Sequence, residues 1–270
     1  MNFSIGIFQG RLSKTKNGIL QRFPKKWENE FFMAKKAGFS FIEYYLEEKF
    51  NRKNPFWSIH GRKKINNLIK QNELENYTIS FNFLIINSLT DIKTNKILKN
   101  AIYNSKELKI KKIILPLENA SQLNETNYIK FAKKITSICK YLGKKQYLLL
   151  ETNVSANLIL KLLNYIKNKK VGICYDIGNR STKKNFRYNE IAKLSKHIYH
   201  IHLKDKSKLN KNVLFGNGLV NFRKFFLILR KINYDNNFTI ESVRGRSILN
   251  VSKKNLLYFK NIIKKSLIRT

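Results

Sequence analysis

The fold of this 270-residue chain is decided by four short apolar runs: YLLLE at residues 147–151, VGICYD at 171–176, HIYHIH at 197–202 and FTIE at 238–241. Each run has the length of a β-strand and is rich in aliphatic or aromatic residues. Parallel strands that are buried on both faces have this character, because neither face meets water. The four runs therefore predict neighbouring strands of a parallel sheet.

Each run ends in a side chain that can carry charge or bind a metal. These end residues are Glu151, Asp176, His202 and Glu241. An unpaired carboxylate is costly to bury, so each acid needs a cation close by. Three carboxylates and one imidazole at the same edge of a sheet form a mixed oxygen and nitrogen set. Such a set suits one divalent metal ion, with Mn, Mg, Co and Zn as candidates.

The rest of the chain keeps alternating between strands and helices. Further strands are predicted at residues 3–8, 39–46, 77–86 and 111–117. Helices are predicted at residues 27–37, 58–71, 91–108, 127–142, 155–168, 188–194, 221–231 and 251–267. Eight such units predict an α/β fold, a (β/α)8 TIM barrel spanning residues 1–270 as a single domain. The alternative is an open doubly wound sheet, but its dinucleotide-binding glycine pattern is missing after the first strand.

The chain is strongly basic, with 54 Lys and Arg residues against 17 Asp and Glu residues and a formal charge of +37. Such a charge can indicate nucleic acid or another polyanion as a partner. The lysines are spread over every segment and accompany abundant Asn and Ile. We therefore interpret the charge as compositional and do not expect a nucleic-acid partner. Because acids are scarce in this chain, an acid at the end of an apolar strand is stronger evidence for a functional site.

The two cysteines, Cys139 and Cys174, are too few for a disulfide framework. This usage fits a reducing, cytoplasmic location. The first residues lack a signal-peptide pattern, and no apolar run approaches the roughly 20 residues of a membrane-spanning helix. We expect a cytoplasmic protein without a membrane partner, and we leave open whether it forms a homo-oligomer.

The chain resembles the xylose isomerase-like TIM-barrel superfamily, the sugar isomerases and epimerases that are related to the AP endonucleases. The resemblance is carried by IGIFQGRL at residues 5–12, CYDIGN at 174–179, HLKD at 202–205 and LFGNGLVNF at 214–222. It implies that the four strand-end residues bind one divalent metal. It also implies that the substrate is a small sugar or sugar phosphate.

The reaction that the resemblance implies is a proton transfer next to a carbonyl, through a metal-stabilised enediolate. Glu151 and Glu241 are the expected acid–base pair, on opposite faces of the substrate. Two such bases would allow epimerisation at C3, and a shuttled proton would allow isomerisation between C1 and C2.

Five further residues are candidates for substrate contact. Arg11 and Arg244 lie at or beyond strand ends and could hold a phosphate or carboxylate. Lys204 could do the same, although lysine is abundant throughout this chain. Glu43, at the end of the second strand, could contact substrate or pair with a lysine. Many epimerases of the superfamily have a substrate-binding His three residues after the strand-six Asp; Asn179 stands there, which affects the substrate more than the metal.

Structural explanations compete with these assignments. Each strand-end acid could be an ion-pair partner in a lysine-rich protein, and His202 could be a core histidine. His200 has the same strand parity as His202 and could also point inward. The GNG sequence at 216–218 could hold an anion, but we favour a tight turn.

Two other functions compete with the isomerase hypothesis. An AP-endonuclease-like, metal-dependent phosphodiesterase acting on DNA is favoured by the charge. It is opposed by the shortage of histidine, because that branch builds a three-zinc cluster and the whole chain has 4 His residues. A barrel without catalytic activity is opposed by the intact set of four metal-ligand types.

We predict that the metal-loaded protein does not cleave abasic DNA, because its histidines are too few for a three-metal cluster. The test is incubation with abasic duplex DNA at near-physiological salt, followed by gel analysis. Metal-dependent nicking that is abolished by Asp176→Ala would contradict the prediction. Salt-sensitive binding without cleavage would not, because positive charge alone produces it.

Overall fold

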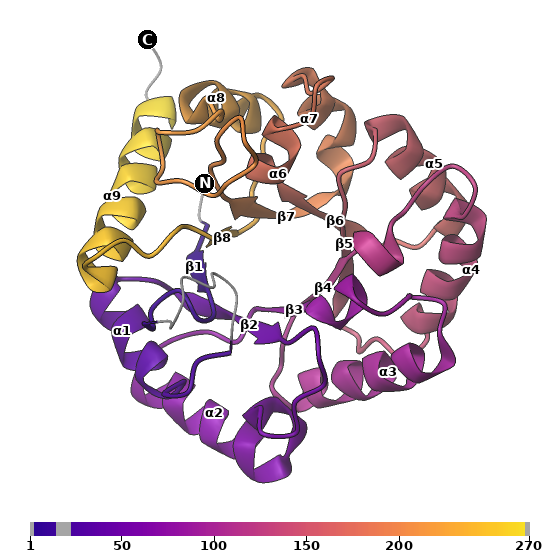
Figure 1. Cartoon of the computed structure of the whole chain (residues 1–270), viewed down its shortest axis with the longest axis horizontal. Coiled ribbons are helices and arrows are strands. Elements are labelled where there is room, and N and C mark those ends of the chain that lie inside the picture. The colour runs from indigo at the N-terminus through magenta and orange to yellow at the C-terminus, as the bar shows by residue number, and fades with distance from the viewer. Residues whose placement is uncertain (1–2, 15–22, 268–270) are drawn as a thin grey trace. The chain divides into compact units, whose positions relative to one another are not determined.

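The computed structural model describes residues 3–14 and 23–267. Eight parallel strands are neighbours in chain order and close into a barrel (Figure 1). The predicted α/β barrel is thus confirmed. The strands are β1 (Ile5–Phe8), β2 (Phe41–Leu46), β3 (Thr78–Phe81), β4 (Lys112–Pro116), β5 (Tyr147–Glu151), β6 (Val171–Asp176), β7 (Ile198–Leu203) and β8 (Phe238–Ile240).

Helices connect the strands, as βα units require. The α-helices are α1 (Asn29–Ala37), α2 (Ile59–Gln71), α3 (Ile92–Glu107), α4 (Tyr128–Cys139), α5 (Ala156–Ile166), α6 (Ile177–Ser181), α7 (Asn189–Leu194), α8 (Phe222–Lys231) and α9 (Ile248–Leu267). Short 3-10 helices are η1 (Pro55–Trp57), η2 (Asn82–Ile85), η3 (Asn119–Ser121) and η4 (Ser195–His197). Within residues 3–14 and 23–267, no helix has both the length and the apolar character needed to cross a membrane.

Several helix ends are set by single residues. The hydroxyl of Ser58 accepts a hydrogen bond from the backbone N–H of Gly61 at 3.0 Å, which caps the first turn of α2. Ser155 caps α5 in the same way, through Leu158. Gly38 ends α1 with a φ of 93°, a left-handed conformation that glycine adopts without strain. These caps explain why the helix boundaries follow the sequence closely.

The third strand is shorter than the sequence predicts. The apolar pattern extends over residues 77–86, but β3 ends at Phe81 and η2 follows. The side-chain amide of Asn82 donates to the carbonyl oxygen and to the hydroxyl of Ser80, at 3.3 and 3.0 Å. Such local side-chain bonds compete with the hydrogen bonds of a strand, which gives a physical reason for the early end.

Contacts along the chain gather into two compact units, residues 1–41 with 175–270, and residues 42–174. In the first unit, Ile240 of β8 is in register with Ile7 of β1 and with Leu203 of β7. On the outer side of this unit, α9 packs against α1 and α8. These contacts hold together β7, which carries His202, and β8, which Glu241 directly follows.

In the second unit, β4 and β5 are paired along their whole length, with Pro116 opposite Glu151. Leu148, Leu149 and Leu150 of β5 are almost completely buried. This pairing fixes the end of β5, and Glu151 with it. That all 270 residues form one domain stays a prediction.

Candidate active site

Four of the predicted site residues form one buried cluster in the first unit. Asp176 ends β6, His202 lies in β7, and Glu241 directly follows β8. Lys204, the residue after β7, lies between the two acids. Its Nζ atom is 2.9 Å from Asp176 Oδ2 and 2.8 Å from Glu241 Oε2. Asp176, His202 and Glu241 are at most 2% exposed, and Lys204 is 6% exposed, so bulk water screens these interactions little.

Arg11 reaches the same cluster from the segment after β1. Its Nη2 atom donates to Glu241 Oε1 at 2.9 Å, and His202 Nδ1 lies 3.7 Å from Glu241 Oε2. Burial by itself raises the pKa of Glu241, but the charges of Lys204, Arg11 and His202 outweigh it and hold that pKa below its usual range. Glu241 is therefore a carboxylate, and not a carboxylic acid, at neutral pH.

Asp176 has a different partner on each oxygen. Its Oδ1 accepts a hydrogen bond from the backbone N–H of Asn179 at 2.7 Å, which caps α6, and its Oδ2 faces Lys204. A Cβ atom on Gly178 would come within 2.7 Å of the carbonyl oxygen of Lys204. Glycine at this position thus allows β7 to pass close to the start of α6.

Two charged residues hold the segment that carries Arg11. The carboxylate of Glu30, in α1, accepts hydrogen bonds from the backbone N–H groups of Gly10 at 2.8 Å and Leu12 at 3.1 Å. Arg244 Nε donates to the carbonyl oxygen of Gly10 at 2.9 Å. Burial, opposed by the hydrogen bonds and by Arg244, raises the pKa of Glu30 to about 7. Arg11 is therefore oriented by groups on both sides of it in sequence.

The GNG sequence at 216–218 forms a turn around an acid of this chain. Asp205 Oδ2 accepts from the backbone N–H groups of Gly216 at 2.9 Å and Gly218 at 3.0 Å, and Oδ1 accepts from Val220 at 3.2 Å. A Cβ atom on Gly218 would clash with Asp205 Oδ1. The favoured tight turn is confirmed, and its N–H groups bind the Asp205 carboxylate.

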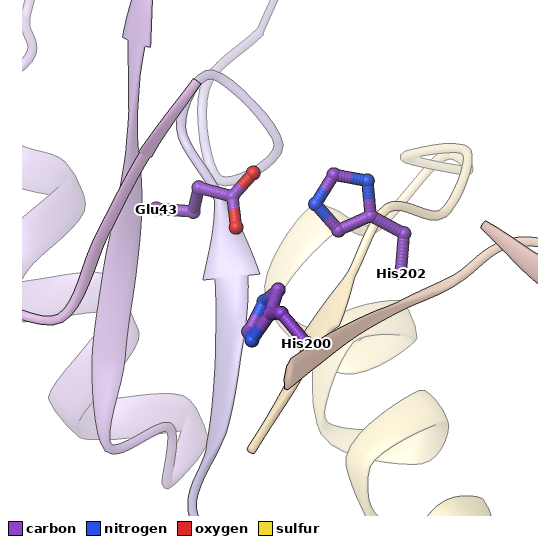
Figure 2. A group of neighbouring side chains, drawn as sticks. All are labelled: Glu43, His200 and His202. Carbon is purple, nitrogen blue, oxygen red and sulfur yellow. The ribbon is translucent and has the colours of Figure 1, made fainter. Parts of the chain in front are cut away.

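His200 and His202 both project from β7. Figure 2 shows the two side chains together with that of Glu43 in β2. The two imidazole rings pack edge to face, with their centroids 5.7 Å apart. His200 Nε2 lies 2.8 Å from the hydroxyl of Thr239 in β8. His200 is fully buried and its ring contacts that of His202, so the two side chains lie on the same side of β7, as their shared parity suggested.

Glu151 and Glu43 belong to the second unit and are both buried. The backbone carbonyl of Glu151 accepts from the N–H of Leu117 at 2.7 Å, which continues the β4–β5 pairing past the strand end. Glu43 lies in the middle of β2 and is completely buried. The backbone of each residue is thus held in its strand.

Two sets of residues offer the ligand types of a divalent metal: Glu151, Asp176 and His202, and Glu43, His200 and His202. The donor chemistry fits an ion such as Mn, Zn or Mg, because carboxylate oxygen and imidazole nitrogen are its usual ligands. The buried carboxylates of Asp176 and Glu241 also satisfy the need for negative charge near such an ion.

A cavity of about 690 Å³ lies beside the segment that carries Arg11. Its lining includes Gly10, Leu12 and residues at the start of α9. Four cationic residues and no acid line it among the described residues: Lys14, Lys25, Lys26 and Arg246. Charge complementarity would favour an anionic group in this cavity.

Sequence reasoning missed Glu30 and Asp205, which hold the segments next to the site. Both bind backbone N–H groups, and such contacts leave no pattern of side-chain types in the sequence. A signal existed for Asp205, which follows Lys204 directly and precedes a glycine-rich turn. For Glu30 the only signal was that acids are scarce.

The chain is similar to known proteins in sequence and in fold. A family model described as xylose isomerase-like TIM barrel matches residues 31–262. L-ribulose-5-phosphate 3-epimerase UlaE of Salmonella paratyphi A is 37% identical over 79 residues, which are 29% of this chain and 28% of that protein. The chain thus matches less than a third of this relative's length.

Solved structures share the fold over nearly the whole chain. D-allulose 3-epimerase from Methylomonas sp. has a TM-score of 0.73 and 14% identity, covering 96% of this chain and 98% of that chain. A structure of the IOLI protein with a bound zinc atom has a TM-score of 0.77 and 12% identity, covering 99% and 100% of the two chains. At these identities the likeness shows the fold alone.

We predict that Glu30 makes stability depend on pH. Its pKa is about 7 in the folded protein against an ordinary value of 4.5, so the folded state binds more protons between these values. The free energy of unfolding should therefore fall as pH rises from about 5 to 8. The expected contribution is about 2–3 kcal/mol, at about 1.4 kcal/mol per pKa unit. Urea unfolding of the wild type and Glu30→Gln across this range measures it.

The matched control is Glu75→Gln, which removes an exposed acid. It should keep the pH dependence of the wild type, whereas Glu30→Gln should flatten it. Equal pH dependence in all three proteins would mean that the Glu30 carboxyl is not held in its protonated form.

Proposed function

Because the chain belongs to the xylose isomerase-like TIM-barrel family, we propose that it is a divalent-metal-dependent sugar or sugar-phosphate isomerase or epimerase. The observation that carries the proposal is the buried cluster of Asp176, His202 and Glu241 at the ends of three successive strands. Two epimerases among the similar proteins, one named for L-ribulose 5-phosphate and one for D-allulose, support a sugar as the substrate.

The metal ligands in this proposal are Glu151, Asp176, His202 and Glu241. Their support is the order of β5 to β8 in the barrel, the burial of all four side chains and the mixture of oxygen and nitrogen donors. A bound divalent ion would supply Lewis acidity that polarises the substrate carbonyl and acidifies the neighbouring C–H bond. The zinc bound in the IOLI structure is consistent with an ion of this kind.

The protein's own part in the reaction is to move a proton. Glu151 and Glu241 are proposed to take and return the proton at the carbon next to the carbonyl, from opposite faces of the sugar. Glu241 suits this role because Arg11, Lys204 and His202 keep it ionised. The same cations make it a weak base, so its substrate must have an acidified C–H bond.

Substrate contacts are proposed for Arg11, Glu43, Asn179, Lys204 and Arg244. Arg11 and Lys204 surround Glu241, and Arg244 holds Gly10 next to Arg11. The cationic cavity beside the same segment supports a substrate with an anionic group such as a phosphate.

We predict that the purified protein holds about one divalent ion per chain and that His202→Ala loses it. The imidazole is a direct ligand in the proposal, and loss of a ligand in a small set lowers affinity strongly. Elemental analysis after dialysis measures the metal content. His197→Ala is the control, because His197 lies in η4, just before β7. Full metal content in His202→Ala would remove His202 from the ligand set.

We also predict that solvent deuterium enters the sugar carbon next to the carbonyl during turnover. Glu151→Gln and Glu241→Gln should each slow turnover by about 100-fold or more, as expected for a lost acid–base group. Candidate ketoses and their phosphates in D₂O, followed by NMR, provide the measurement. Glu125→Gln, an exposed acid, should leave the rate unchanged.

One result would contradict the two-glutamate mechanism. If a substrate turned over with direct hydrogen transfer between carbons and no uptake of deuterium, a hydride shift would replace proton transfer. The metal assignment would survive that result, because it depends on binding and not on the path of the hydrogen.

A further inference from the structure

We infer that Lys204 is an internal competitor of the metal: its ammonium group holds the oxygen atoms of Asp176 and Glu241 that a bound divalent ion needs. The inference rests on the proposed metal dependence and goes beyond it, since it concerns what the protein does with these acids before the ion arrives. All three residues belong to the first unit of the chain.

Each of the two carboxylates has one oxygen held by another donor. Asp176 Oδ1 accepts the N–H of Asn179 at the start of α6, and Glu241 Oε1 accepts from Arg11. The other oxygen of each acid faces Lys204, at 2.9 Å for Asp176 Oδ2 and 2.8 Å for Glu241 Oε2. If the two carboxylates held an ion while keeping their bonds to Asn179 and Arg11, the oxygen atoms that would bind it are those that Lys204 contacts.

The ammonium group and a divalent ion repel each other at such short range, and the repulsion is strong where water is excluded. Lys204 is 6% exposed, so little solvent lies between them. Lysine carries its charge on a flexible four-carbon stem, which allows the ammonium group to move without moving the backbone. Entry of the ion is therefore coupled to departure of the Lys204 ammonium from the two acids.

This exchange has two effects. Without metal, Lys204 compensates two buried acids whose repulsion would otherwise destabilise the folded state. With metal, a cation is released next to the ligands, where it can bind an anionic group of the substrate such as a phosphate or carboxylate. The metal-free and metal-bound states would thus use the same lysine for different partners.

The test is the affinity for Mn²⁺, measured by competition with a chelating dye, of the wild type, Lys204→Met and Lys206→Met. Lys206 is a matched control, because it lies two residues further on and its Nζ donates to Asn210. Removing the competitor should tighten Mn²⁺ binding by about tenfold or more, the range expected for a buried ion pair. Lys206→Met, which removes the same charge nearby, should stay within roughly threefold of the wild type.

Thermal unfolding gives a second readout that does not depend on activity. Metal-free Lys204→Met should unfold at a lower temperature than the metal-free wild type. Mn²⁺ should raise the Tm of Lys204→Met by more than it raises the Tm of the wild type. If Lys204→Met does not fold without metal, Lys204→Gln provides a neutral side chain that can still donate to both acids. Its Mn²⁺ affinity should also exceed that of the wild type.

Equal Mn²⁺ affinity in Lys204→Met and Lys206→Met would overturn the inference, because the ammonium group and the ion would then coexist. Weaker binding by Lys204→Met would overturn it too, because Lys204 would then be orienting the acids for the ion. In both cases the proposed metal site would stand. Absence of Mn²⁺ binding in every protein would instead overturn the metal proposal, and this inference with it.

Discussion

A buried carboxylate must be paired with positive charge, and the first unit of this protein is arranged around that requirement at Glu241. Arg11 comes from the segment after β1 and Lys204 from the end of β7, so the ion pairs of one acid join three neighbouring strands. The cost of leaving such an acid unpaired is several kcal/mol. The hydrogen bonds from Gly10 and Leu12 to Glu30 hold the segment from which Arg11 reaches this acid.

Much of the fold could be predicted because buried parallel strands appear in the sequence as continuous apolar runs. β5 and β6 have the bounds of the apolar runs at 147–151 and 171–176, and the polar residue at the end of each run marks the edge of the barrel. The prediction was less accurate at β3, where Asn82 bonds to Ser80 and ends a strand that the apolar pattern continues. Periodicity describes burial, and it does not register a local hydrogen bond that competes with the sheet.

The candidate site also has residues that the sequence predicts and contacts that it does not. Asp176, His202 and Glu241 could be found from the sequence because strand ends bring them to one edge, and the structure brings them together. The contacts of Lys204 with both acids could not be found, because lysine is common in this chain and its reach is set by side-chain packing. Glu30 was missed for a related reason: it binds the backbone of residues about 20 positions earlier, and such a pairing depends on how α1 is placed.

The turn around Asp205 has a consequence for protein engineering. Three backbone N–H groups between Gly216 and Val220 are tied to an acid that is three residues from His202. The loop after β7 is therefore anchored at its base, whereas residues 208–211 at its tip are exposed, with Leu209 78% exposed. Libraries that aim to change substrate preference can vary this tip in sequence and length, while the base of the loop keeps β7 in its place.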